Sequence, residues 1–113
     1  MNKELIDRIC KQLPNGVSME DSDSITIDEV DYDWCVIEEL PTEDEGKYQF
    51  GGTIYGVGHK SKEGYGIVGD PLFYVEQDFT QTGSYYSYQE RTFDKPYVVE
   101  KKEKIITVWE AVR

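Results

Sequence analysis

The acidic side chains of this sequence could take part in several kinds of chemistry, and they are concentrated in one stretch. Residues 20–45 contain twelve carboxylates and no Lys or Arg. The twelve are Glu20, Asp21, Asp23, Asp28, Glu29, Asp31, Asp33, Glu38, Glu39, Glu43, Asp44 and Glu45. Carboxylates at this density could bind a cation, act as an acid and base pair, or present a negative surface to a basic partner.

Two D-x-D segments resemble the opening of a calcium-binding loop. They lie at residues 21–23 and 31–33. An EF-hand loop needs an oxygen ligand at its fifth position, a glycine at its sixth and a glutamate at its twelfth. Ile25 and Cys35 occupy the fifth positions, so the sequence predicts no EF-hand. Weak calcium binding by a carboxylate cluster stays as an alternative, and we predict no resident metal or cofactor.

Asp31 and Asp33 could also form a catalytic pair. They are two residues apart in a segment with strand periodicity, which would send both side chains to one face. Glycosidases and aspartic proteases use two neighbouring carboxylates in this way. The alternative is a solvated strand face without an enclosing cleft. We predict that alternative, and with it a non-enzymatic protein that has no catalytic residue.

The other candidate motifs lack the surroundings that their chemistry requires. His59 is the only histidine, so paired-histidine metal sites are excluded. The glycines at positions 64, 66 and 69 spell G-x-G-x-x-G, but Asp70 and Pro71 follow where a dinucleotide site needs a helix. Residues 56–61 match a phosphate loop only in part. None of these motifs predicts a ligand.

Charge is divided unequally along the chain. The net charge of −11 lies entirely in residues 1–46, because residues 47–113 hold nine acids and nine bases. Nucleic acids and anionic membranes are bound through clustered Lys and Arg. The nearest such cluster is Lys101, Lys102 and Lys104, and acids interrupt it. We therefore predict no direct contact with nucleic acid or membrane, and a basic protein as the partner.

Two cysteines and the absence of a long apolar run bear on location. Cys10 and Cys35 fit neither a disulfide framework nor a zinc spacing. The first 14 residues lack the apolar run of a signal peptide, and no window approaches the length of a spanning helix. These features predict a cytoplasmic protein.

The first element that could position these side chains is an amphipathic helix of about eleven residues. Asn2 is a suitable N-cap, and one stripe collects the apolar side chains. Pro14, Asn15 and Gly16 should end the helix. The stripe consists of Leu5, Ile6, Ile9, Cys10 and Leu13. A helix this short needs a partner surface, which we expect to be a sheet.

Strand periodicity begins after this helix. It predicts a short strand at residues 24–28 and a longer one at 31–39, with the acids of the longer strand facing outward. An acidic turn is expected at residues 41–46. Further expected segments are a strand at 48–59, apolar runs at 65–68 and 72–76, a polar connection at 77–83, strands at 84–93 and 97–100, and a buried strand at 105–112.

Together these patterns predict one α+β domain over residues 1–113. Its N-terminal helix packs on a mostly antiparallel sheet of about five to seven strands. The functional hypothesis is an acidic binding protein whose carboxylates imitate phosphates and mask a basic, nucleic-acid-binding partner. The alternative is an accessory or structural subunit that assembles through a tyrosine-rich sheet, with acidity serving solubility. The tyrosines concerned are Tyr74, Tyr85, Tyr86, Tyr88 and Tyr97.

Overall fold

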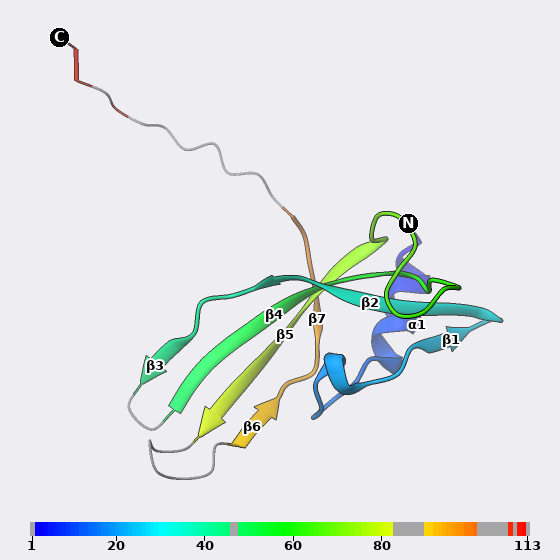
Figure 1. Cartoon of the computed structure of the whole chain (residues 1–113), viewed down its shortest axis with the longest axis horizontal. Helices are drawn as coiled ribbons and strands as arrows, with labels where there is room; N and C mark the ends of the chain where they lie inside the picture. The colour runs from blue at the N-terminus through cyan, green and yellow to red at the C-terminus, as the bar shows by residue number, and fades with distance from the viewer. Residues whose placement is uncertain (1, 46–47, 83–89, 102–108, 110, 113) are drawn as a thin grey trace.

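The structure is a computed structural model, and it describes residues 2–45, 48–82, 90–101, 109 and 111–112. Figure 1 shows one helix and a long, curled sheet. The elements are α1 (Lys3–Gln12), a 3₁₀ turn η1 (Met19–Asp21), β1 (Ile25–Ile27), β2 (Val30–Glu39), β3 (Glu43–Glu45), β4 (Tyr48–His59), β5 (Phe73–Thr82), β6 (Glu90–Phe93) and β7 (Tyr97–Val99). The predicted α+β class is confirmed.

The seven strands of the described residues pair antiparallel in the order β1-β2-β4-β5-β6. β3 also pairs with β4, and β7 also pairs with β5. The long strands β4 and β5 therefore form the centre of the sheet. β2 and β3 follow one another along one side of this pair, and β6 and β7 follow one another along the other side.

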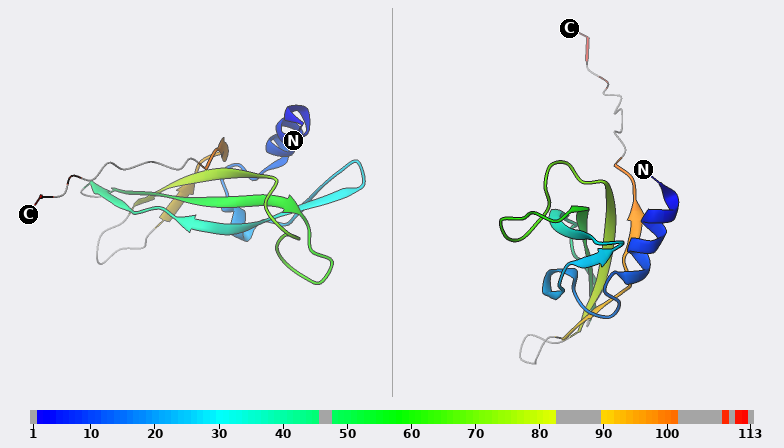
Figure 2. Two further views of the ribbon diagram at one scale, coloured as in Figure 1. Left: turned by 90° about the horizontal axis from the view of Figure 1, so that it is seen from above. Right: turned by 90° about the vertical axis from the view of Figure 1, so that its right-hand side faces the viewer.

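Helix α1 forms as the sequence predicts. The Asn2 side chain accepts a hydrogen bond of 2.8 Å from the Glu4 amide, which satisfies one of the free N–H groups of the first turn. Ile9 and Leu13 are buried against the sheet, with Leu5, Ile6 and Cys10 packed beside them. Figure 2 shows the helix on one face of the sheet.

The buried core lies between this helix and one half of the sheet. Its strand residues alternate along β2, β4 and β5, which places them on the helix-covered face. They are Ile27, Tyr32, Trp34, Tyr55, Val57, Phe73 and Val75. Because α1 is about 15 Å long and β4 about 40 Å, the helix can cover only part of this face.

A buried glutamine fastens the segment after the helix to the sheet. The side-chain oxygen of Gln77 accepts a hydrogen bond of 2.9 Å from the main-chain amide of Met19. The side-chain NH₂ group of Gln77 donates hydrogen bonds to the main-chain carbonyl oxygens of Val17 and Asp94, at 2.8 and 3.1 Å. The Trp34 indole donates to the Met19 carbonyl at 2.7 Å. Met19 is thereby held on the core, and η1 lies beside the sheet.

The opposite face of the sheet is covered at one end by the loop of residues 60–72. Gly56 makes room for it, because an added Cβ there would lie 2.5 Å from the Pro71 ring. The same loop buries Asp33, which is 8% exposed and accepts a hydrogen bond of 2.9 Å from the Gly66 amide. The prediction that the β2 acids all face solvent is therefore wrong for Asp33.

Other expectations need correction. Residues 43–45 of the predicted turn form β3, because they pair with residues 48–50. The predicted polar connection at 77–83 is strand as far as Thr82, since hydrogen bonds satisfy its buried glutamines. Residues 65–68 form no strand beyond a bridge at Ile67.

Two predicted strands fall partly outside the described residues. Of the strand predicted at 84–93, residues 84–89 lie outside them, and residues 90–93 form β6. Of the predicted buried strand at 105–112, residues 105–108 and 110 lie outside them. Trp109 and Val112 are 92% and 99% exposed and belong to no strand, so that prediction is wrong for them.

Candidate functional site

The twelve predicted site residues lie in four places. Asp28 and Glu29 form the turn between β1 and β2, and β3 with Glu43 to Glu45 lies at the other end of the sheet (Figure 1). Asp31, Asp33, Glu38 and Glu39 belong to β2, while Glu20, Asp21 and Asp23 lie on or just after η1. The structure brings part of this set together, around two adjoining hollows.

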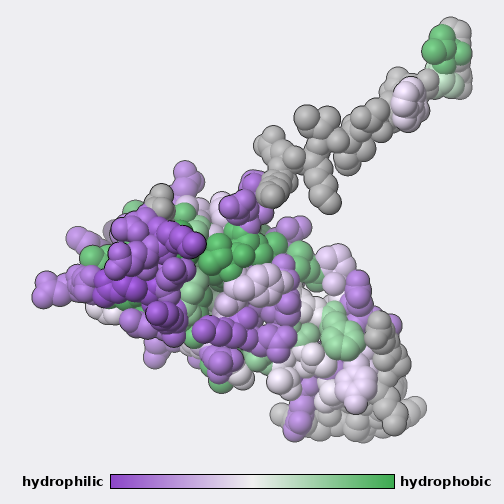
Figure 3. All heavy atoms as spheres, turned by 180° about the vertical axis from the view of Figure 1, so that it is seen from behind, coloured by the Kyte–Doolittle hydropathy of each residue, from purple (hydrophilic) through white to green (hydrophobic). Residues whose placement is uncertain are grey.

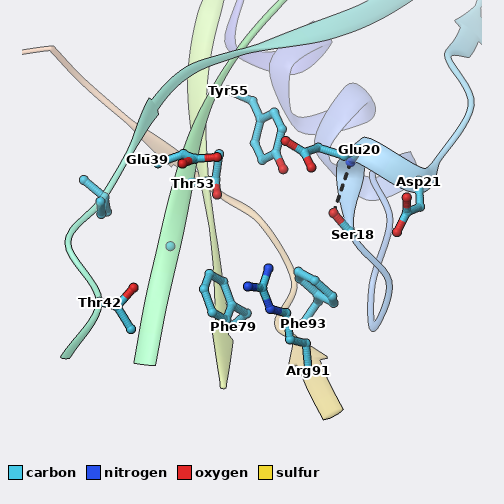
Figure 4. Close-up of a pocket in the computed structure, with 12 residues that line it drawn as sticks. Ser18, Glu20, Asp21, Glu39, Thr42, Thr53, Tyr55, Phe79, Arg91 and Phe93 are labelled. Atoms are coloured by element: carbon cyan, nitrogen blue, oxygen red, sulfur yellow. Dashed lines mark hydrogen bonds between the residues drawn. The ribbon is translucent and has the colours of Figure 1, made fainter. Parts of the chain in front are cut away.

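The first hollow, which we call the Arg91 cleft, has a volume of about 370 Å³. Figure 4 shows carboxylates on its upper side and a guanidinium between two aromatic rings on its lower side. Its lining residues are Ser18, Glu20, Asp21, Glu39, Leu40, Thr42, Gly52, Thr53, Tyr55, Phe79, Arg91 and Phe93. Acidic, basic and aromatic side chains thus share one small space.

A β-bulge places Glu39 in the Arg91 cleft. Val36 pairs with Tyr55, but Glu38 pairs with Ile54, so Ile37 is an extra residue in β2. A bulge shifts the alternation of side chains by one. Glu39 consequently lies opposite Thr53, on the helix-covered face, and Glu38 is turned to the other face.

Arg91 is held in place from two sides. Its guanidinium carbon lies 4.7 Å from the centre of the Phe79 ring, a cation–π distance. Its Nε donates a hydrogen bond of 2.8 Å to the side-chain oxygen of Gln81. Phe79 in turn packs against Gly51, where an added Cβ would be 2.5 Å from the ring. Gly51, Phe79 and Arg91 therefore form an ordered stack.

The upper side of the Arg91 cleft combines hydroxyls with acids. Ser18 is the N-cap of η1 and accepts a hydrogen bond of 3.2 Å from the Glu20 amide. Burial raises the pKa of Tyr55, and the charges of Glu20 and Asp21 raise it further. The Tyr55 hydroxyl therefore stays protonated and can donate a hydrogen bond at neutral pH.

The second hollow, which we call the acidic hollow, shares Glu20, Asp21 and Tyr55 with the Arg91 cleft. Its other acids are Asp23 and Asp33, and none of its lining residues is basic. The Asp33 carboxylate accepts hydrogen bonds from the amides of Trp34 and Gly66, at 2.8 and 2.9 Å, so it serves the fold. The acids of η1 and Asp23 are exposed to solvent.

Few cations neutralise these acids. Within the described residues, the one ion pair joins Arg8 to Asp28, at 2.7 Å. The Arg8 hydrogen bond and charge lower the pKa of the Asp28 carboxyl. Seen from behind, hydrophilic side chains gather over the end of the molecule that carries α1 and the β1–β2 turn (Figure 3). The acids of η1 and of the end of β2 form no ion pair with another described residue.

A separate acidic pair lies on the opposite face of the sheet. The Tyr97 hydroxyl donates a hydrogen bond to Glu76 and lies 3.1 Å from Asp78 Oδ2. Burial, together with the contact to Glu76, raises the pKa of Asp78 to about 6. The contact with Glu76 is the main cause that raises the pKa of Tyr97. This pair joins β5 to β7 and does not border the Arg91 cleft.

The remaining sequence candidates are placed as follows. Asp31 accepts a hydrogen bond from Thr26, whereas Asp33 accepts hydrogen bonds from the amides of Trp34 and Gly66. His59 is exposed and stacks on Tyr32, with 5.4 Å between ring centres. The glycines at 64, 66 and 69 all have positive φ and lie in the loop before β5. No cluster of acidic, histidine or cysteine side chains in the described residues is arranged to hold a metal.

The tyrosine and lysine candidates are only partly described. Tyr74 is half-buried, Tyr97 is 46% exposed, and Tyr85, Tyr86 and Tyr88 lie outside the described residues. Lys101 is exposed, while Lys102 and Lys104 also lie outside them. In the part of the chain that the structure describes, no helix has the length and hydrophobicity to cross a membrane.

Sequence reasoning did not find the basic and aromatic side of the Arg91 cleft. Phe79 and Gln81 are two residues apart on β5, and Arg91 and Phe93 are two residues apart on the neighbouring strand β6. Phe79 lies opposite Phe93, and Gln81 lies opposite Arg91. This repeated spacing was a signal for a shared face. The comparisons add no relative: no family model matches the chain, and neither the curated proteins nor the solved structures gave a match.

Proposed function

We propose that this chain is a small, non-enzymatic, cytoplasmic binding protein whose acidic surface docks on a basic, nucleic-acid-binding partner. The observation that supports this most is the clustering of Glu20, Asp21, Asp23 and Glu39 around two adjoining hollows. None of the four forms an ion pair in the described part of the chain. Their charges are therefore available to a partner.

The hydration of the four carboxylates lets them lie near one another, and their negative charge favours binding to a basic partner. Exposed carboxylates keep most of their hydration, so holding four of them near one another costs little in water. A basic partner would gain attraction from all four, and the long-range field would speed the encounter. At physiological salt the screening length is about 8 Å, and it shortens as salt rises further, so binding should weaken.

The experiment is capture of basic proteins from a lysate of the source cells on the immobilised full chain. We expect DNA- or RNA-binding proteins to be retained at about 50 mM salt and lost at about 500 mM. We also expect duplex DNA added at low salt to elute them, because it competes for the same basic surface. Retention that ignores both salt and DNA would contradict the proposal.

A second candidate function has its own observation. Large apolar side chains are exposed on the sheet, including Ile37, Tyr48 and Phe50 at 48%, 50% and 39%. Such residues favour assembly through the sheet, as an accessory subunit would require. Self-association that is unchanged between low and high salt, measured by sedimentation, would support this candidate over the first.

A further inference from the structure

We propose that the Arg91 cleft binds a basic amino-acid residue with a free α-carboxylate. The carboxylate would contact Arg91, and the side-chain cation would lie against Glu20 and Glu39. The inference rests on the proposed function, because it names what the basic partner inserts into the acidic surface.

The lower side of the cleft is built for an anion. The Phe79 ring and the Gln81 side chain fix the plane of the Arg91 guanidinium. The Nη groups point toward the hollow in Figure 4, and no carboxylate of the described residues lies within ion-pair distance of them. A guanidinium held in this way offers two parallel N–H donors, which match a carboxylate.

The upper side of the cleft is built for a cation. Glu20 and Glu39 come from η1 and from the end of β2, and the bulge at Ile37 turns Glu39 toward the hollow. The Tyr55 ring stands between them, with Thr53 beside Glu39 and Ser18 beside Glu20 (Figure 4). A lysine or arginine side chain could exchange its water shell for these oxygens.

Charge selects a ligand that carries both signs. A ligand with only negative groups would be repelled by the three lining carboxylates, and one with only positive groups would be repelled by Arg91. The volume of about 370 Å³ is near the lower end for small-molecule sites. It suits one residue and excludes a folded loop. A polypeptide C-terminus that ends in Lys or Arg has this chemistry, and so does the free amino acid.

The test is calorimetric titration of the full chain with acetyl-Gly-Gly-Lys. Two comparison peptides each remove one group: the C-terminal amide removes the carboxylate, and norleucine in place of lysine removes the cation. We expect the acid form with lysine to bind at least about tenfold more tightly than either, as loss of a charge-assisted contact implies. No heat of binding at about 10 mM peptide, or equal binding of all three, would overturn the inference.

Variants assign the two ends. Arg91→Gln should remove the preference for the acid over the amide, and Glu39→Gln should remove the preference for lysine over norleucine. Gly51→Ala should weaken all binding without a change of charge, because it displaces the Phe79 ring. Glu63→Gln in the exposed loop is the matched control and should bind like wild type. Unchanged preferences in Arg91→Gln and Glu39→Gln would overturn the assignment.

Two further outcomes identify the source of the ligand and separate this inference from the proposed function. Free lysine that binds as tightly as the peptide supports the site with an amino acid as its ligand, whereas weaker binding supports a polypeptide C-terminus. Absence of peptide binding with salt-sensitive capture of basic proteins intact overturns the inference and leaves the proposed function standing. Absence of both overturns both.

Discussion

The two halves of the helix-covered sheet face differ in what covers them and in which side chains they carry. In the closed half, α1 and the Met19 segment cover Tyr32, Trp34, Val57 and their neighbours, and all ten buried hydrophobic residues of the described ranges belong to this cluster. In the open half, the same face carries Thr53, Gln81 and Arg91 and borders the Arg91 cleft. A short helix on a long sheet leaves part of this face uncovered, and here the uncovered part collects opposite charges beside two aromatic rings.

The largest loss of stability is expected when a side chain is removed from the closed half. Ile9→Ala should destabilise the protein by about 3 kcal/mol, because Ile9 is fully buried and its loss leaves a cavity. Ile37→Ala is the matched control, since Ile37 is 48% exposed, and it should cost less than about 1 kcal/mol. Urea unfolding measures both. Equal losses would contradict the tight packing of Ile9 in the closed half.

The next largest effect tests the polar link between the halves. Gln77→Leu should cost about 2–3 kcal/mol in urea unfolding, because it leaves the Met19 amide and two carbonyl oxygens without partners. Gln49→Leu on β4 is the control, since Gln49 is on the same face of the sheet and is not one of the partners of this network. A stable Gln77→Leu variant with wild-type affinity for basic protein would show that the Gln77 hydrogen bonds are not required to hold η1 in place.

A smaller, pH-dependent effect belongs to the opposite face. The fold raises the pKa of Asp78 from 3.8 to about 6, so it favours the protonated form. This contribution is fully present below pH 3.8 and is lost as the pH rises through about 6. Asp78→Asn should therefore melt near wild type at pH 4 and above it at pH 7. A difference in melting temperature that stays constant across this range would contradict the shift.

The smallest effect concerns the turn at the end of the closed half. Asp28 and Glu29 have φ of 50° and 67°, the backbone of a two-residue hairpin turn that favours glycine. Glu29→Gly should raise the free energy of unfolding by about 0.5–1 kcal/mol. Glu29→Ala keeps the Cβ, so it should show no such gain. Equal gains in both variants would point to relief of charge repulsion in place of backbone strain.

The sequence predicted the elements that local rules govern. The Asn2 cap, the apolar stripe of α1 and the alternation along β2 and β4 fix their structures within a few residues. The acidic stretch was also evident. These features depend on neighbours in the chain, which is why composition and periodicity were sufficient for the α+β class.

Long-range pairing explains what the sequence did not reveal. Gln77 looked like a loop residue, because its three partners lie up to 60 residues away. The bulge at Ile37 depends on the register between β2 and β4, so the direction of Glu39 could not be read from alternation. Asp33 is buried by a loop more than 30 residues later in the chain. The Arg91 cleft depends on the first two of these contacts, and the acidic hollow depends on the third.

The most direct test is the affinity of a captured basic partner for two variants with the same change of charge. One variant neutralises Glu20, Asp21, Asp23 and Glu39 around the hollows. The other neutralises Glu4, Asp7, Glu63 and Asp70, which are exposed elsewhere. The account predicts at least about a tenfold loss of affinity for the first variant at physiological salt and near wild-type affinity for the second. Equal losses in both would show that net charge alone governs binding and would contradict a defined acidic site.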